Sequence, residues 1–232
     1  GMEITMKQTD IINPFQPYMT LEMDGYSQIN RTDYGISHFY EFTIHDEKKH
    51  CIKAVPDASI DLLFNIGENK VSTYISGTVF GVKKWELGTQ DDCFGVRFQP
   101  GQGILPKDIT MEMIVNDDIE IDGDIFGKNL TEKIALAKTM SERIDIFKKA
   151  YEDMVLGRNS LSDKEKINEY LVNRISRTKG MITMRQLEDE TNYSACYLRR
   201  IFKSFHGISP KQFAQYIRFQ NLLMQADKEG VR

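Results

Sequence analysis

The chain lacks any long apolar run, and it is poor in cysteine, histidine and proline. Its 232 residues include 3 Cys, 4 His and 6 Pro. Because no run of about 18 apolar residues occurs, we expect no membrane-spanning helix and no membrane partner. The first residues, GMEITMKQTD, do not pair a basic segment with an apolar one, so we expect no secretory signal. These absences favour a cytoplasmic protein.

The metal-binding and catalytic patterns are also missing. The three cysteines are Cys51, Cys93 and Cys196. An odd, scattered set is typical of a reducing compartment rather than of a disulfide framework. The four histidines do not stand near these cysteines at ligand spacing, so we expect no metal and no other cofactor. A nucleophile elbow, a Walker loop and a G-x-G-x-x-G fingerprint are absent too, so we do not expect an enzyme.

Charge is unevenly spread along the chain. Over the whole sequence, 30 Lys and Arg stand against 34 Asp and Glu, which gives a formal net charge of −4. Residues 163–232 hold 13 Lys and Arg against 8 Asp and Glu, whereas residues 1–162 hold 17 against 26. A basic C-terminal part that follows an acidic N-terminal part indicates that only one of the domains contacts nucleic acid.

Residues 36–101 are typical of a series of short strands. The segments ISHFYEFTI, SIDLLFNIG and KVSTYISG are rich in β-branched and aromatic residues, and KKWEL and DDCFGVRFQPG follow them. Gly, Asn and Asp separate the segments. Short strands at this spacing predict a β-sandwich or barrel-like domain, which we place at residues 1–127.

Two charged residues interrupt these apolar strands. Asp61 and Arg97 each stand between two apolar residues. On an alternating strand, each must face away from its apolar neighbours. Three interpretations are open: the two residues line a cavity and hold a polar or charged ligand, they point to solvent, or they pair with each other. The first makes Asp61 and Arg97 candidate ligand-binding residues.

Helical periodicity replaces the strand pattern from about Leu130. The segment TMSERIDIFKKAYEDMVLG has Thr139 and Glu142 at the spacing of a capping box and ends at a glycine. We expect it to belong to a helical connector over residues 128–160. Its apolar stripe consists of Ile144, Phe147, Tyr151 and Met154. That stripe suits packing on the front domain or a dimer surface, and we favour packing.

Residues 161–232 carry three capping signatures of the form S/T-x-x-E/Q. The pairs are Ser162 with Glu165, Thr183 with Gln186, and Ser209 with Gln212. In each pair the hydroxyl can accept a hydrogen bond from the third helical amide, and the longer side chain can bond back to the cap. Three such boxes predict a compact all-helical domain over residues 161–232. The whole chain is therefore predicted to be α+β.

Two of the expected helices form a helix-turn-helix pattern. The segment TMRQLEDET makes about two turns, TNYS is a short turn, and Ser194 caps the second helix. On that second helix the apolar residues gather on one side, and the opposite side carries Cys196, Arg199, Arg200 and Lys203. This side carries no carboxylate, whereas a solvent-exposed helix face usually carries charges of both signs. Such a helix fits the major groove, where Arg can donate two hydrogen bonds to guanine.

The segment LEDETNYSACYLRRIFKSFHGISPKQFAQYIRFQNLL resembles the DNA-binding region of the AraC/XylS family of transcriptional regulators. The shared features are Leu187, Ser194, Leu198, Arg200, Phe202, Lys203, Gly207, Ser209 with Pro210, and a following helix with Phe213 and Arg218. The segments PDASIDLLFNIG and GVRFQPG also look like a companion domain found ahead of such regions. The family's DNA-binding region has two helix-turn-helix units joined by a long helix. Because this chain ends at Arg232 after one unit, we expect a fragment that is truncated after the first.

The resemblance implies roles for six residues of the second helix. Cys196, Arg199 and Arg200 would occupy groove-facing positions. Backbone phosphates would be contacted by Ser194, Tyr197 and Lys203. The basic side chains suit these roles physically, and a small side chain at Cys196 could touch a thymine methyl group.

Two hypotheses of different classes follow. The first is a transcription regulator that binds double-stranded DNA, with a front domain that senses a small-molecule effector or forms a homodimer. The second is a small-molecule-binding β-domain protein whose helical tail serves only for packing or dimerisation. Loss of the basic side chains should abolish the function under the first hypothesis and leave it intact under the second.

Overall fold

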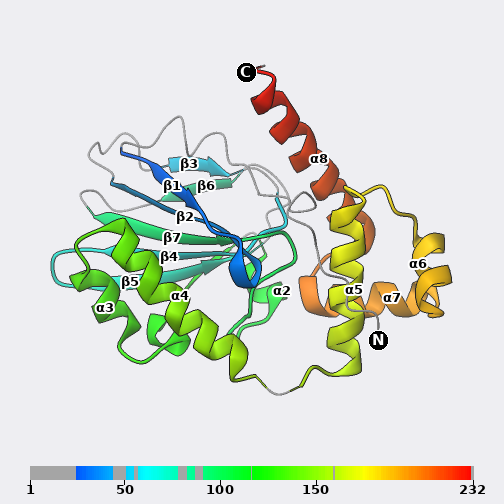
Figure 1. Ribbon diagram of the computed structural model, residues 1–232, viewed down its shortest axis with the longest axis horizontal. Helices are drawn as coiled ribbons and strands as arrows, with labels where there is room; N and C mark the ends of the chain where they lie inside the picture. Colours follow the sequence, from blue (N-terminus) through cyan, green and yellow to red (C-terminus); the bar gives the residue numbers. More distant parts are fainter. Residues whose placement is uncertain are drawn as a thin grey trace.

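The computed structural model describes residues 25–43, 51–54, 57–77, 83–86, 91–115, 117–158 and 160–230, with side chains described outside residues 51–54 and 83–86. A sheet unit, residues 25–158, is followed by a helical unit, residues 160–230 (Figure 1). The chain is α+β, as the sequence predicted. No described helix combines the length and the apolar character needed to cross a membrane.

The sheet unit is built on one antiparallel sheet of six strands in the order β1-β2-β7-β4-β5-β8. These strands are β1 (Ser27–Asn30), β2 (Ile36–Thr43), β4 (Asp61–Ile66), β5 (Val71–Ser76), β7 (Asp92–Phe98) and β8 (Asp118–Ile121). Strands β3 (Cys51–Ala54) and β6 (Lys83–Glu86) form a separate antiparallel pair. The six-stranded sheet is not closed, because β1 and β8 are its two edges and do not pair with each other.

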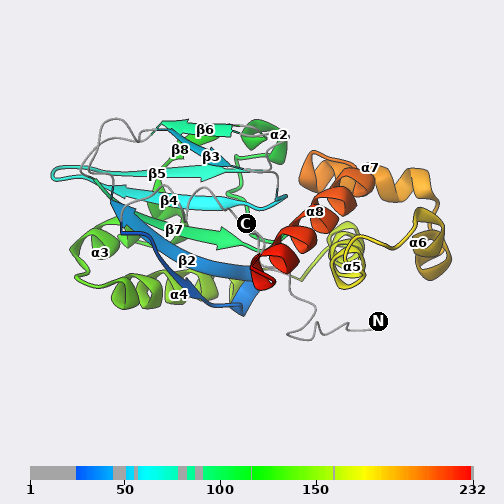
Figure 2. The same ribbon diagram turned by 90° about the horizontal axis from the view of Figure 1, so that it is seen from above.

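Two helices cover one face of this sheet, α3 (Leu130–Leu136) and α4 (Met140–Leu156) (Figure 2). Alternate residues of the central strands, among them Phe39 and Phe64, are fully buried against α4. The ring centroids of both lie 6.0–6.1 Å from that of Phe147 on α4. The expected apolar stripe of α4 therefore packs on the sheet, and its aromatic contacts form the core of this unit.

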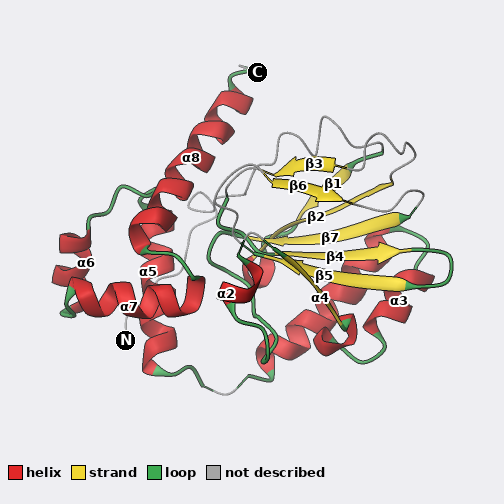
Figure 3. Cartoon of the chain, turned by 180° about the vertical axis from the view of Figure 1, so that it is seen from behind, coloured by secondary structure: helices red, strands yellow, loops and turns green. Residues whose placement is uncertain are grey.

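The helical unit comprises α5 (Asp163–Arg177), α6 (Met184–Thr191), α7 (Ala195–His206) and α8 (Pro210–Lys228). All three expected capping boxes are present, at Ser162, Thr183 and Ser209. Figure 3 shows α6 at the end of the molecule away from the sheet, with α7 running back toward the short helix α2 (Met111–Ile114). The shorter elements η2 (Asp33–Gly35) and η4 (Gly123–Phe126) belong to the sheet unit.

The two units meet where a loop and a turn of the sheet unit press against α5. Ala58, in the left-handed conformation with φ of 58°, is buried in the core of the helical unit. Its carbonyl accepts a hydrogen bond of 3.2 Å from Gly101 N. Gly101 has φ of 74°, and a Cβ there would come within 2.9 Å of Val172 Cγ1. The missing side chain therefore allows this turn to approach α5 closely.

Candidate nucleic-acid interface

The turn between α6 and α7 is held by side chains of the two helices themselves. Asn192 ends α6 in the left-handed conformation, with φ of 59°. Ser194 Oγ accepts a hydrogen bond of 3.2 Å from Tyr197 N, as expected for an N-cap. Glu188 Oε1 on α6 accepts a hydrogen bond of 2.5 Å from Ala195 N. The bond to Glu188 thus ties the start of α7 to α6, and the bond to Ser194 caps α7 itself.

The inner side of α7 is locked into the helical unit. Leu198 and Phe202 are fully buried, and Leu187 of α6 joins the same cluster. At the end of α7, His206 Nε2 lies 2.6 Å from Asn168 Oδ1 on α5. Burial lowers the pKa of His206 to about 4, so this ring is neutral near pH 7. These contacts fix which side of α7 faces outward.

The outward side of α7 carries the predicted DNA-contact residues. Those that are exposed are Ser194, Cys196, Arg199, Arg200 and Lys203. Tyr197 is half-buried, and its ring centroid lies 5.1 Å from that of the exposed Tyr193. The structure therefore brings all six predicted residues to one end or one side of a single helix. We call Cys196, Arg199, Arg200 and Lys203 together the basic face.

The cations of the basic face are available to an external anion. Among the described residues, none forms a hydrogen bond or ion pair with the side chains of Arg199, Arg200 or Lys203. On α6, the carboxylate of Glu190 is paired with α5, where it accepts hydrogen bonds of 2.9 and 2.7 Å from Arg174. The positive charge of the face is therefore left to solvent and to a binding partner.

The predicted ligand-binding residues, Asp61 and Arg97, pair with each other inside the sheet unit. They are directly opposite on β4 and β7. Arg97 Nε and Nη2 donate to the two Asp61 carboxylate oxygens at 2.7 and 2.5 Å, and Nη1 donates to Asp57 Oδ2 at 2.8 Å. Arg97 is 2% exposed and Asp61 is 4% exposed. Of the three open interpretations, mutual pairing is what the structure contains, and a ligand role stays a prediction.

Aromatic side chains enclose this charged network on the face of the sheet opposite α4. Tyr40 Oη donates to Asp61 Oδ2 at 2.9 Å, and the Tyr40 ring lies beneath the Arg97 guanidinium at 5.9 Å. Tyr26 stacks on Tyr40, and burial raises the pKa of Tyr26 to about 12. Burial acts to lower the pKa of Arg97, but the carboxylates of Asp61 and Asp57 outweigh it and raise that pKa above its ordinary value. Arg97 is therefore a permanent buried cation.

No group of three or more metal-ligating side chains occurs within the described part of the chain. Cys93 is buried and Cys196 is exposed, and both thiols are free. The side chain of Cys51 and the residues His45 and His50 lie outside the described residues.

Three residues at these sites were not predicted from the sequence. Glu188 was overlooked as a cap because it lies on the preceding helix, although an acidic residue shortly before an N-cap is a usable signal. Tyr193 sits in the turn, next to the expected phosphate contact Tyr197. Asp57 binds Arg97 and also accepts a hydrogen bond of 3.0 Å from Ser59 N. The Pro-Asp-Ala-Ser segment indicates such an Asx turn.

Comparison with known proteins gives one match. A family described as a domain of unknown function (DUF6597) matches residues 34–120, from η2 into β8. No curated protein matches the chain. No solved structure matches it either. The matched family covers the sheet unit only and does not reach α6 or α7.

Proposed function

We propose that this chain is a DNA-binding transcription regulator of the AraC type that acts in the cytoplasm, with the basic face as its DNA-reading surface. The observation that carries the proposal is the helix-turn-helix whose outward face presents Arg199, Arg200 and Lys203 without a partner among the described residues. The sheet unit senses a small molecule or mediates self-association.

Phosphate contacts supply most of the affinity in this mechanism. The DNA backbone on either side of the groove is contacted by Lys203 and by two residues at the start of α7, Ser194 and Tyr197. Each neutralised phosphate releases condensed counterions, so the logarithm of the binding constant falls by about 0.9 per phosphate for each tenfold rise in salt. A surface of this kind binds many sequences at low salt.

Base contacts supply the specificity. Arg199 and Arg200 are long enough to donate to guanine O6 and N7, and each such contact discriminates by about 1–3 kcal/mol. The thiol of Cys196 is small and nearly apolar, which suits contact with a thymine methyl group. Because Ser194 and Glu188 fix the start of α7, these side chains are presented from a rigid helix.

The test is fluorescence anisotropy of a labelled mixed-sequence duplex at 50 and 200 mM salt. The wild-type chain is compared with Arg199→Ala/Arg200→Ala and with the control Lys133→Ala/Lys149→Ala. The control removes the same charge from exposed positions on α3 and α4. We expect salt-sensitive binding that weakens at least about tenfold in the first variant and changes little in the control.

Two outcomes count against the proposal. Equal loss in both variants would mean that net charge, not the basic face, drives binding. No binding by any of the proteins at 50 mM salt would favour the alternative, in which the helical unit serves only for packing or dimerisation.

A further inference from the structure

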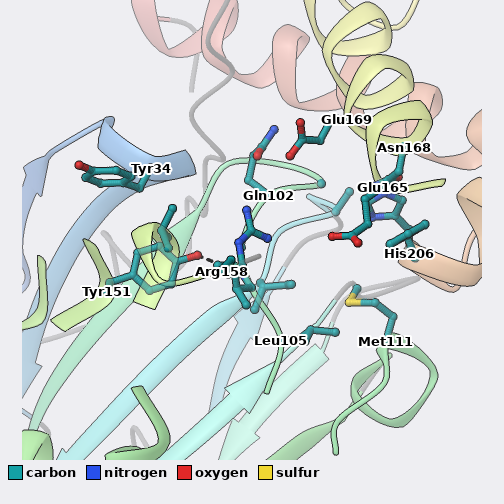
Figure 4. Close-up of a pocket in the computed structure, with 17 residues that line it drawn as sticks. Tyr34, Gln102, Leu105, Met111, Tyr151, Arg158, Glu165, Asn168, Glu169 and His206 are labelled. Carbon is teal, nitrogen blue, oxygen red and sulfur yellow. Dashed lines mark hydrogen bonds between the residues drawn. The ribbon is translucent and has the colours of Figure 1, made fainter. Parts of the chain in front are cut away.

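A cavity of about 440 Å³ lies at the junction of the sheet unit and the helical unit. Its walls come from the loop after β7, the end of α4, α5 and the end of α7 (Figure 4). The volume is in the lower part of the range of small-molecule sites. One small molecule would therefore touch both units, including the last turn of the helix that carries the basic face.

The apolar part of the wall and the charged part have different sources. Leu105 and Met111 come from the sheet unit, and Phe205 comes from α7. Arg158 follows α4 and Glu169 lies on α5, and Figure 4 shows both side chains directed into the space between the units. A ligand there would meet an apolar patch, the cation of Arg158 and the carboxylates of Glu169 and Glu165.

Most other polar groups around the cavity already form hydrogen bonds, whereas the side-chain amide of Gln102 has no partner among the described residues. His206 is bonded to Asn168 at 2.6 Å, and Tyr151 Oη accepts a hydrogen bond of 3.0 Å from Ile104 N. Glu165 closes the capping box of α5. By contrast, the side chains of Arg158 and Glu169 have no hydrogen-bond or ion-pair partner among the described residues. Those two charges are left to bind a ligand.

Electrostatics at the two groups agree with this geometry. Partial burial, with a smaller contribution from the carboxylate of Glu165, raises the pKa of Glu169, and the positive charge of Arg158 acts in the opposite direction. A ligand that carried only a carboxylate would pair with Arg158 and leave Glu169 unpaired. A ligand that carried only an amine would pair with Glu169 and leave Arg158 unpaired. Arg158 and Glu169 are both exposed, so an unpaired charge at either costs little. A ligand with both charges is favoured because it gains charge-assisted hydrogen bonds at both side chains, where a ligand with one charge gains them at one.

We infer that this cavity binds a small zwitterion with an apolar body, of the class of the apolar amino acids. The ligand carboxylate binds Arg158, its ammonium group binds Glu169, and its apolar part packs on Leu105, Met111 and Phe205. A bound molecule adds contacts across the junction and holds α7 in one orientation relative to the sheet unit. Occupancy of the cavity then changes DNA affinity, and DNA changes ligand affinity by the same factor. This last consequence rests on the proposed function, whereas ligand binding does not.

Isothermal titration calorimetry without DNA tests the site. The probes are L-leucine, 3-methylbutylamine, which lacks the carboxylate, and 4-methylpentanoate, which lacks the amine. L-leucine should bind, and each half-charged analogue should bind at least about tenfold more weakly. Arg158→Ala and Glu169→Gln should each weaken L-leucine binding by a similar factor. The matched controls Lys133→Ala and Glu132→Gln remove exposed charges on α3 and should leave it unchanged.

Several results would overturn the inference. These are no heat from L-leucine, L-methionine or L-phenylalanine at 10 mM, equal binding of the half-charged analogues, or unchanged binding in both cavity variants. L-leucine binding by a chain that does not bind DNA would contradict the proposed function and still support the ligand site in the cavity. DNA binding by a chain that gives no heat with any of these amino acids would contradict the ligand site and leave the proposed function intact.

Discussion

Asp61 and Arg97 occupy directly opposite positions on β4 and β7, and the guanidinium of Arg97 binds both oxygens of the Asp61 carboxylate. The remaining terminal nitrogen of Arg97 reaches Asp57, which lies next to Ala58 in the loop before β4. Since Ala58 is buried in the core of the helical unit, this ion network holds in place the loop before β4, through which the sheet unit contacts the helical unit. It links the interior of the sheet unit to the position of the helix-turn-helix.

Arg97→Met should lower the free energy of unfolding by about 3–5 kcal/mol, because it leaves the buried carboxylates of Asp57 and Asp61 without their cation. Urea denaturation followed by circular dichroism measures the change. The control is Arg174→Met, which breaks a partly exposed pair with Glu190 and should cost at most about 1 kcal/mol. Equal costs for the two variants would mean that water reaches the Arg97 network.

Gly101→Ala should destabilise the junction between the units by about 1–3 kcal/mol. The new Cβ meets both a left-handed backbone and the side chain of Val172 at 2.9 Å. Gly25→Ala is the matched control, because Gly25 also has positive φ but a Cβ there meets nothing within 4 Å. Urea denaturation of both variants separates the two causes. If they lose the same stability, backbone strain alone explains the loss and the close approach to α5 contributes nothing.

Local signals in the sequence predicted most of the fold. Strand alternation located β2, β4, β5 and β7, and caps such as Ser162 and Ser209 located α5 and α8, because these features depend on neighbouring residues. The short edge strands β1 and β8 were not predicted. Each has only four residues and pairs on one side, so its pattern is too short to be recognised.

The arrangement of the candidate site residues was predictable on α7 and not elsewhere. Helical periodicity alone puts Arg199, Arg200 and Lys203 on one side. By contrast, pairing of Asp61 with Arg97 depends on the register of two strands that are separated by other elements, and a single sequence does not reveal register. The cavity at the junction depends on how the units dock, which brings Met111 and Phe205 to one space through contacts distant in sequence.

Stability should fall as the pH falls from about 6.5 toward 4. The folded pKa of His206 is about 4, below the value of about 6.5 for an unfolded histidine. Between these values the unfolded chain binds the proton more tightly, so protonation favours unfolding by up to about 1.4 kcal/mol per pH unit. His38, whose pKa burial lowers to about 3, acts with the same sign.

Urea denaturation at pH 7.5, 6.0, 5.0 and 4.5 checks this dependence. His206→Gln keeps an N–H group that can reach Asn168 but does not titrate, so its stability should vary less with pH. The remaining slope should come largely from His38. Identical slopes in the wild type and the variant would mean that the pKa of His206 is the same in the folded and the unfolded chain.

Glu188→Ala should lower the free energy of unfolding by about 1 kcal/mol, since Ala195 N then loses its acceptor at the start of α7. Glu188→Gln retains a carbonyl acceptor and should cost less. The control is Asp189→Ala, an exposed neighbour on α6 whose side chain forms no hydrogen bond among the described residues. Comparable effects of Glu188→Ala and Asp189→Ala would assign the loss to helix charge and not to the cap.

Duplex DNA should protect Cys196 from alkylation. Its thiol is exposed on the basic face between the expected phosphate and base contacts, whereas Cys93 is fully buried. The rate of modification by a maleimide, followed at Cys196 by peptide mass spectrometry, should fall at least about fivefold at saturating DNA, because the groove covers this side of α7. Arg199→Ala/Arg200→Ala should remove the protection. Heparin supplies the negative charge without a groove and should protect less than DNA. Full reactivity of Cys196 in a DNA complex would place the DNA on another surface and contradict the orientation of α7 proposed above.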